Sequence, residues 1–374
     1  MRHVQALADE IGLRPAGSDG EVRAAQYLLA ELKSYGYRTE EQTFQYQSIS
    51  DDGTLLQVLE PDSRVLNARL MVGSIAGQSE GQLIAAGSGR PEEFSLRMSG
   101  NIALVQRGQL DFGEKVANAV TAGAIGVIVY NFEPGLFFGN LQSSTIVPVV
   151  IVSQESGEYL LSRLGSGTMK VRIEVRAEEV VRTSRNIIAR PPFGVCEVLV
   201  GAHHDSVPVG PGANDDASGV ATVLELARSL AAAGSAGNVC FALFGAGEAG
   251  QLGSQAFLKQ ISPGDKASLK AVIDLDTVGV GERWQLVGDQ RLARIAAKAA
   301  GDPGLGAETA LASALETSDT ATFLDAGIPA VRLTATPDPR EHTASDVSVF
   351  IRPELLAQAA RMAASVILAT VGQP

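Results

Sequence analysis

Hydrophobic positions near the start of the chain recur at the spacing of a helix, and they predict two helices within the first 36 residues. Ser18 and Glu21 are spaced as in a capping box, which indicates where the second helix begins. The stretch 43–47 then alternates as a strand does. The helical stripes are Val4, Leu7 and Ile11 in the first helix and Val22, Ala25, Leu29 and Leu32 in the second.

From about Ser48 the pattern changes to short hydrophobic runs that are separated by turns rich in Gly and Ser. Two helical stretches, 115–122 and 157–164, interrupt these runs. Short strands at this spacing predict a small β-rich domain over residues 49–181. The runs that read as strands are 66–72, 82–86, 102–105, 146–152 and 171–175.

From Asn186 onward hydrophobic strands alternate with helices, a pattern typical of an α/β sheet that is covered on both faces. Because the two N-terminal helices cannot form a domain alone, we assign them to the same sheet. We therefore predict one discontinuous α/β domain, residues 1–48 and 182–374, interrupted by the β-rich domain. The predicted strands are 195–200, 239–244, 271–275 and 330–333, and the predicted helices are 218–233, 291–300 and 353–370.

Charge and hydropathy argue against two classes of partner. The 374 residues include 30 Lys and Arg against 42 Asp and Glu, a formal net charge of −12. This charge disfavours nucleic acid and an anionic membrane surface as partners. No run reaches the ~18 apolar residues of a membrane span. The first residues lack the hydrophobic core of a signal peptide, so the expected compartment is the cytoplasm for the chain as written, or outside the cell if it begins after processing.

The chain has only two cysteines, Cys196 and Cys240, and both lie in hydrophobic, strand-like runs. Two cysteines make no disulfide framework of the kind that holds small secreted domains together. We expect both to be free thiols that behave as small hydrophobic side chains.

Histidines and acids follow the predicted strands of the α/β domain, and one acid precedes a helix. In such sheets, sites lie beyond the carboxyl ends of the strands, so we expect these side chains at one edge. A bare carboxylate cluster would repel itself, and a pair of divalent cations would relieve that repulsion. Histidine with Asp and Glu suits zinc, with Mn or Co as alternatives. The residues are His203, Asp205, Asp215, Glu248, Asp276 and His342.

Each of these residues also has an ordinary structural interpretation. An Asp before a helix, such as Asp215, is usually an N-cap. An Asp that ends a strand, such as Asp276, often forms a turn. The residues taken together are far more specific than any one of them, and we expect the neighbouring His204 to support the site or to be exposed.

The motifs around these residues resemble, in order, those of the M28 family of di-zinc aminopeptidases. The opening segment 14–18 and the segment 318–323 are similar to that family as well, and residues 102–124 resemble a protease-associated domain. The matching motifs are His203-x-Asp205, Asp215-x-x-Ser218-Gly219, Glu248-x-Gly250-x-x-Gly253-Ser254, Leu275-Asp276-x-x-Gly279 and His342-Thr343-x-x-Asp346.

The resemblance implies a metal-dependent exopeptidase that binds two divalent ions, with zinc as the expected metal. His203 and Asp276 would bind one ion, Glu248 and His342 the other, and Asp215 would bridge them.

The implied fold is a zinc-exopeptidase-like mixed sheet flanked by helices, with an inserted β-rich domain. Asp205 would hold the ring of His203 by its second nitrogen. The substrate would be a peptide, cut at its N-terminal bond.

The chain departs from the family at one catalytic position. The family carries two adjacent glutamates, a general base followed by a ligand, whereas this chain reads Gly247-Glu248. Glycine cannot accept a proton, and general acid–base groups typically contribute ~10²–10⁴-fold in rate. Glu341 is the nearest replacement base in sequence, and Glu282 and Glu316 are weaker candidates.

Several alternatives remain at this stage. The chain can be a weak peptidase, a metal-binding pseudo-peptidase without activity, or an enzyme with another chemistry of the family, carboxypeptidase or glutaminyl cyclase. Gly245-x-Gly247-x-x-Gly250 also fits a dinucleotide-binding fingerprint, but that interpretation leaves the histidines unexplained and brings Glu248 near the phosphates. Gly77-x-Ser79-x-Gly81 fits a serine-hydrolase elbow, although it falls in the β-rich domain.

Overall fold

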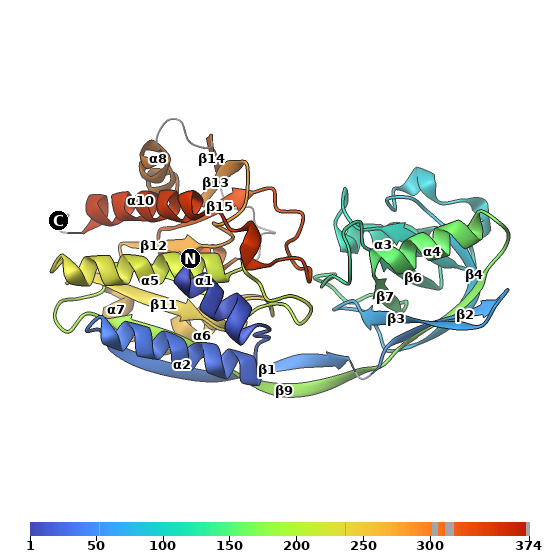
Figure 1. Cartoon of the computed structure of the whole chain (residues 1–374), viewed down its shortest axis with the longest axis horizontal. Helices are drawn as coiled ribbons and strands as arrows, with labels where there is room; N and C mark the ends of the chain where they lie inside the picture. Colours follow the sequence, from blue (N-terminus) through green and yellow to red (C-terminus); the bar gives the residue numbers. More distant parts are fainter. Residues whose placement is uncertain (52, 236, 301–305, 311–317, 372–374) are drawn as a thin grey trace. The chain divides into compact units, whose positions relative to one another are not determined.

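Figure 1 shows the computed structural model of the chain, which describes residues 1–51, 53–235, 237–300, 306–310 and 318–371. The chain divides into two compact units. The larger unit comprises Met1–Tyr46, Arg182–Glu341 and Asp346–Pro374, and the inserted unit comprises Gln47–Val181 with the short segment His342–Ser345. Among the residues described, no helix has both the length and the hydrophobicity needed to cross a membrane.

A mixed eight-stranded sheet forms the centre of the larger unit, in the order β1-β9-β11-β10-β12-β15-β13-β14. The four strands β11, β10, β12 and β15 are parallel neighbours, whereas β9 and β13 pair antiparallel with β11 and β15. This mixed sheet agrees with the predicted fold class. The bounds are β1 (Arg38–Asp51), β9 (Ala177–Arg190), β10 (Val198–His203), β11 (Val239–Phe244), β12 (Ala271–Leu275), β13 (Arg283–Gly288), β14 (Ala307–Ala310) and β15 (Ala330–Thr336).

Helices cover both faces of this sheet. Alternate residues of a strand point to opposite faces, so Val198 and Val200 of β10 pack in the core of one face and Leu199 packs in the core of the other. The first face carries α2 (Asp19–Ser34), α5 (Ala217–Ala232), α8 (Gln290–Ala299) and α10 (Pro353–Thr370), and the second carries α6 (Leu252–Gln260) and α9 (Asp319–Asp325). Burial on both faces explains why the central strands are mainly hydrophobic.

The remaining short helices of the larger unit lie at its N-terminus and in its loops. The first predicted helix is α1 (Arg2–Gln5), which continues as a π-helix, η1 (Ala6–Ile11). Ser18 caps α2, because its Oγ accepts a hydrogen bond from the N–H of Glu21 at 3.2 Å. This confirms the predicted start of that helix. The others are α7 (Pro263–Ser268) and the 3₁₀ turn η4 (Ser348–Phe350).

Cys196 and Cys240 form a disulfide, so the prediction of two free thiols is wrong. Strand pairing explains the bond. β10 and β11 are parallel neighbours in which Val198 lies opposite Val239 and Leu199 lies opposite Cys240, which brings Cys196 close to Cys240. The two Cα atoms are 5.5 Å apart, a separation that a disulfide spans.

The inserted unit is a closed barrel with strand order β2-β3-β7-β6-β5-β4-β8. Its hydrophobic residues form two cores. The bounds are β2 (Leu55–Glu60), β3 (Arg64–Leu70), β4 (Gly77–Ala85), η2 (Pro91–Glu93), η3 (Leu96–Met98), β5 (Ile102–Gln106), α3 (Phe112–Thr121), β6 (Gly126–Tyr130), β7 (Val149–Val152), α4 (Gln154–Leu164) and β8 (Lys170–Val175).

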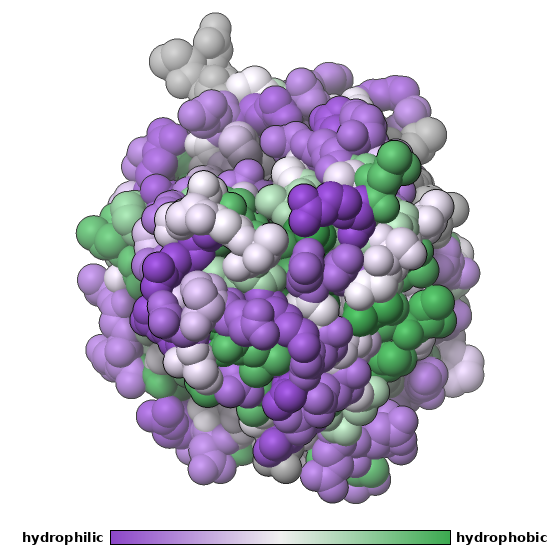
Figure 2. Space-filling model, turned by 90° about the vertical axis from the view of Figure 1, so that its right-hand side faces the viewer, coloured by the Kyte–Doolittle hydropathy of each residue, from purple (hydrophilic) through white to green (hydrophobic). Residues whose placement is uncertain are grey.

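One face of the molecule shows mainly hydrophilic residues with small, separate hydrophobic groups (Figure 2).

Candidate metal centre

Three of the predicted ligands lie together at the carboxyl ends of the parallel strands. His203 is the last residue of β10, and Asp276 directly follows β12. Asp215 lies in the loop that leads from β10 to α5, immediately before Asp216, the N-cap of that helix. One ring nitrogen of His203 and one carboxylate oxygen of each of the two acids all lie within 4.8 Å of one another. Nitrogen and oxygen donors at this spacing suit zinc or a similar divalent ion.

A second group of potential ligands shares Asp215 with the first. Glu248 lies in the loop between β11 and α6, and His342 lies in the loop after β15. The ligand atoms of Asp215, Glu248 and His342 also lie within 4.8 Å of one another. The structure therefore brings the five predicted ligands into two groups of three with one carboxylate in common. Their roles as ligands stay a prediction.

Asp205 contacts both His203 and the loop that carries Glu248. The Nδ1 atom of His203 lies 3.5 Å from Oδ1 of Asp205 and 3.2 Å from its backbone oxygen. The carboxylate of Asp205 accepts hydrogen bonds from the N–H groups of Gly247 at 2.8 Å and of Glu248 at 3.2 Å. Nε2 of His203 lies 3.0 Å from Oδ1 of Asp215. Asp205 thus contacts the ring on one side and leaves Nε2 directed at the other candidate ligands.

Burial makes negative charge costly in this region. Burial raises the pKa of Asp216 well above its ordinary value, and it raises the pKa of Asp346 to about 7. Burial alone would lower the pKa of His203, but its contacts with the carboxylates of Asp205 and Asp215 raise it well above 6.5. A buried acidic cluster of this kind favours cations, and a bound divalent ion would be the largest local positive charge.

Position 247 has no room for a side chain in this backbone. A Cβ atom on Gly247 would lie 2.6 Å from Cγ and 3.0 Å from Nδ1 of His203. A Cβ contact below 3.0 Å requires one of the two groups to move. The predicted loss of a general base at position 247 and the orientation of the His203 ring are therefore linked.

The structure places two of the three predicted replacement bases, and both are exposed. Glu341 directly precedes His342, and its N–H donates to the backbone oxygen of Asp338 at 3.4 Å. Glu282 follows β12 by seven residues and precedes β13. Glu316 lies outside the described residues. A catalytic role for Glu341 stays a prediction.

Asp346 supports the loop of Asp215, a role that the sequence analysis missed. Its carboxylate accepts hydrogen bonds from the N–H groups of Asn214 at 2.7 Å and of Asp215 at 3.0 Å. The sequence did contain an indication of this role, because Asp346 belongs to the motif that begins at His342. The neighbouring His204 is fully buried, with Nε2 3.1 Å from the backbone oxygen of Arg185, so it is not exposed.

Asn186 is a second residue that sequence analysis missed, and it joins the two ends of the loop that carries Glu248. Its Oδ1 accepts the N–H of Gly245 at 3.1 Å, and its Nδ2 donates to the oxygen of Gly253 at 2.8 Å. Both partners are backbone groups, which almost every residue type supplies. These contacts therefore cannot be predicted from a sequence pattern.

The structure supports neither of the two alternative motifs, the serine-hydrolase elbow at Ser79 and the dinucleotide-binding fingerprint at residues 245–250. Ser79 lies inside strand β4, and its Oγ donates to the backbone oxygen of Ile125 at 2.6 Å. A serine-hydrolase elbow needs a turn from a strand to a helix, so Ser79 is no such nucleophile. The loop 245–250 does connect a strand to a helix, but it carries Glu248 among the candidate ligands.

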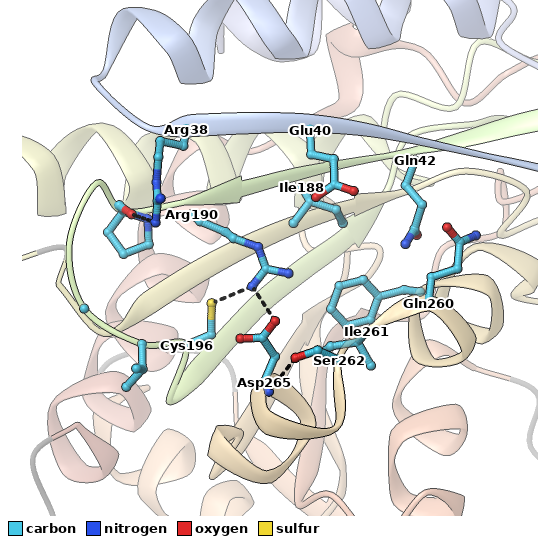
Figure 3. Close-up of a pocket in the computed structure, with 14 residues that line it drawn as sticks. Arg38, Glu40, Gln42, Ile188, Arg190, Cys196, Gln260, Ile261, Ser262 and Asp265 are labelled. Carbon is cyan, nitrogen blue, oxygen red and sulfur yellow. Dashed lines mark hydrogen bonds and ion pairs between the residues drawn. The ribbon is translucent and has the colours of Figure 1, made fainter.

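A separate pocket of about 400 Å³ lies on the larger unit between β1, β9 and the helices α6 and α7 (Figure 3). Arg190 and Asp265 point toward one another across it, with 3.7 Å between Nη1 and Oδ2. The pocket also reaches Cys196, which precedes β10, whereas His203 ends that strand. Pocket and ligand groups therefore lie at opposite ends of β10, and none of the five predicted ligands lines the pocket.

Parts of both units match known protein families. Residues 186–367 match peptidase family M28, and residues 70–160 match the PA domain. The chain is 33% identical to aminopeptidase YwaD of Bacillus subtilis (strain 168), over 75% of this chain and 61% of that protein. It is 30% identical to leucine aminopeptidase 2 of Trichophyton equinum, over 71% of this chain and 54% of that protein.

A solved structure extends the similarity to nearly the whole chain. BSAP, a zinc aminopeptidase from Bacillus subtilis, superposes with a TM-score of 0.78 at 27% identity, covering 98% of this chain and 93% of that one. The chain spans less than two thirds of the length of the two relatives compared by sequence, since it covers 61% and 54% of them.

Proposed function

Because the chain belongs to peptidase family M28 and contains a PA domain, we propose that it is a metal-dependent exopeptidase of the aminopeptidase type, acting on the N-terminal bond of peptides. The observation that carries this proposal is the pair of ligand groups that share Asp215. Similarity to aminopeptidases supports the activity, and the net charge of −12 supports the absence of a nucleic-acid partner.

The donors present fit two divalent ions, and zinc is the metal that we propose. His203 and Asp276 would hold one ion, Glu248 and His342 the other, and Asp215 would bridge them. Each position then has one histidine nitrogen with carboxylate oxygens, a donor set typical of zinc. Bound there, two such ions would lower the pKa of a water molecule between them and polarise the carbonyl of the scissile bond.

The protein's own side chains would set the geometry and move the proton. Asp205 holds Nδ1 of His203, so that Nε2 is available as the donor atom. Position 247 offers no group that could accept a proton, and we propose that Glu341, next to His342 in the chain, replaces it. A well-placed general base typically raises the reaction rate ~10²–10⁴-fold. Because Glu341 is exposed, we expect it to be a poorer base and the enzyme to be slow.

We further propose that residues 1–48 and 182–374 carry the chemistry, and that residues 49–181 form a separate protease-associated domain. The disulfide between Cys196 and Cys240 favours an oxidising compartment, because thiols are kept reduced in the cytosol of most organisms. We therefore place the working protein outside the cytoplasm, the second of the two compartments expected from sequence.

The test measures metal content and peptidase activity together. The purified chain should contain two zinc ions and release 4-nitroaniline from a panel of aminoacyl 4-nitroanilides. Glu248→Gln and Asp276→Asn should each lower the zinc content and abolish this activity. Asp289→Asn is the matched control, because Asp289 also follows a strand, but its Oδ1 caps α8 by accepting the N–H of Leu292 at 3.0 Å.

A chain that binds no divalent metal would refute the proposal. Peptides with a blocked N-terminus, and peptides with N-terminal glutamine, are tested in parallel. Cleavage of the first set from the C-terminus, or cyclisation of the second, would assign one of the other family chemistries instead.

Gly247 supports a second candidate, a protein that binds metal and peptide without cleaving. Zinc binding with no turnover of any substrate, combined with retention of a peptide that has a free N-terminus, would establish that function. Slow turnover that is lost in Glu341→Gln would exclude it and support Glu341 as the base.

A further inference from the structure

Arg14 is a completely buried cation that binds backbone oxygens from two parts of the larger unit. All five of its guanidinium contacts are carbonyl oxygens of the main chain, and none of the five is a carboxylate. Nε donates to His204 at 2.9 Å, Nη1 donates to Leu7 at 3.0 Å, Gly12 at 3.0 Å and Pro211 at 2.6 Å, and Nη2 donates to Gly212 at 3.1 Å.

Three of these oxygens bracket the segment that joins two candidate ligands. His204 directly follows His203, and Gly212 lies three residues before Asp215. A single planar group thus bonds the segment near both of its ends. Because a guanidinium presents its donors in a rigid fork, it fixes the distance between those ends as a flexible ammonium does not.

The main chain of residue 14 bonds the same segment at a third point. The N–H of Arg14 donates to Oγ of Ser206 at 3.0 Å, and the N–H of Ser206 donates to the backbone oxygen of Arg14 at 3.2 Å. On the other side, Leu7 and Gly12 lie in and directly after the π-helix η1. Arg14 therefore ties the loop to the N-terminal helical segment, which is packed in the core.

The charge of Arg14 also faces the acidic cluster. Burial lowers its pKa to about 10, and the carboxylates of Asp205, Asp346, Asp216 and Asp215 favour its charged form. Removal of this cation would leave those carboxylates with less compensation before any metal binds.

We propose that Arg14 is a positioning residue that holds the segment between His203 and Asp215 in the conformation that binds metal. The proposal rests on the proposed function, because it takes those two residues as ligands. Arg14 touches neither ligand side chain, and it acts through the backbone that carries them.

The experiment titrates Zn²⁺ into metal-stripped full-length protein by calorimetry and compares wild type with Arg14→Lys and Arg14→Met. Loss of a group that orients ligands typically costs ~10–100-fold in metal affinity, and we expect that range for Arg14→Met. Arg14→Lys keeps the positive charge but lacks the planar guanidinium, so its zinc affinity should lie between those of wild type and Arg14→Met. At saturating Zn²⁺, the kcat of Arg14→Lys should recover while KM stays near that of wild type.

Lys115→Met is the matched control. Lys115 is also fully buried, and its Nζ donates to the backbone oxygens of Ser88 and Gly108 in the inserted unit. This variant should lose thermal stability without any change in zinc affinity. Circular dichroism of the metal-free proteins verifies the fold, and Ser206→Ala, which removes the hydroxyl that accepts the Arg14 N–H, replaces Arg14→Met if that variant does not fold.

The outcomes separate the two proposals. Wild type that binds no Zn²⁺ refutes the proposed function. Wild type that binds Zn²⁺ with an affinity equal to that of Arg14→Met, or of Ser206→Ala where it is used, refutes the positioning role alone. An equal loss of affinity in Lys115→Met also refutes it, because the effect would then follow from stability in general.

Discussion

At position 247 the lack of a side chain is matched by the ring of His203, which occupies the space that a Cβ would need. The resemblance to the family predicts a glutamate at this position, where the chain has Gly247, but the sequence does not show what fills the space. Reinstating the glutamate is therefore not a simple repair, because the substitution would displace either the ring or the loop that carries Glu248.

We predict that Gly247→Ala weakens zinc binding and that Gly247→Glu does not raise peptidase activity. A contact of 2.6 Å forces either the His203 ring or the loop of Glu248 to move, and either movement disturbs the candidate ligands. Calorimetric zinc titration and 4-nitroanilide hydrolysis check both variants. Gly264→Ala is the control, because a Cβ there meets no atom closer than 3.9 Å. A large gain in rate for Gly247→Glu would show that the loop adapts and that the base alone was missing.

Glu21 is a second single residue with a measurable consequence. It is fully buried, its Oε2 accepts the N–H of Gly17 at 2.7 Å, and its Oε1 accepts a hydrogen bond from Ser184. Burial nevertheless raises its pKa from 4.5 to about 7. The folded state therefore holds the proton of Glu21 more tightly than the unfolded state does.

We predict that this residue destabilises the wild type as the pH rises from about 4.5 to 7. The penalty is absent below that window and complete above it, where it approaches about 3 kcal/mol by linkage. Urea unfolding at pH 5 and pH 8, with a chelator present, should show a steeper loss of stability for wild type than for Glu21→Gln. Equal pH dependence of the two proteins would contradict the prediction, and Glu282→Gln, an exposed substitution, should behave as wild type.

At the level of elements, β11 and β12 were predicted with their observed bounds, whereas β10 was predicted three residues too early. β10, β11 and β12 are buried on both faces, so their sequences are mainly hydrophobic, although β12 includes Asp274. β13 was missed, because alternation with polar residues and an exposed start weaken its pattern. β6 was missed because it continues a run of small residues that also contains a helix end. The disulfide was predicted wrongly, because the pairing of β10 with β11 is not visible in either strand alone.

We predict that the disulfide between Cys196 and Cys240 stabilises the larger unit by about 2–4 kcal/mol, the usual contribution of such a bond. The bond links residues 44 positions apart, so its loss releases a long loop in the unfolded chain. The double variant Cys196→Ala/Cys240→Ala should lower Tm, and dithiothreitol should lower the Tm of wild type but not that of the double variant. A reductant effect of equal size on both proteins would show that it does not act through this bond.

At the level of the whole molecule, the candidate site could be assembled from sequence because parallel strands end at one edge of a sheet. That rule placed His203, Asp215 and Asp276 together, and the structure agrees. The rule does not predict the hydrogen bonds that hold the loops of these residues in place. Arg14 and Asn186 each bond backbone groups far away in sequence, such as those of His204 and Gly245, which only the folded chain brings within reach.

Because the candidate ligands are distributed over several loops, we predict that metal stabilises the native state as a whole. Zn²⁺ at 100 times its Kd should add about 2.7 kcal/mol to the free energy of unfolding for each ion that binds. A chelator should therefore lower Tm, and added Zn²⁺ should restore it, whereas Mg²⁺, which prefers oxygen ligands in octahedral geometry, should not. A Tm that is the same with and without Zn²⁺ would contradict the prediction.

Asp215 belongs to both ligand groups, and this has a consequence for how the centre fills. An ion held at either position would draw on this one carboxylate, and so would change the negative charge that Asp215 offers to the other position. A change at this one aspartate would therefore weaken both positions together.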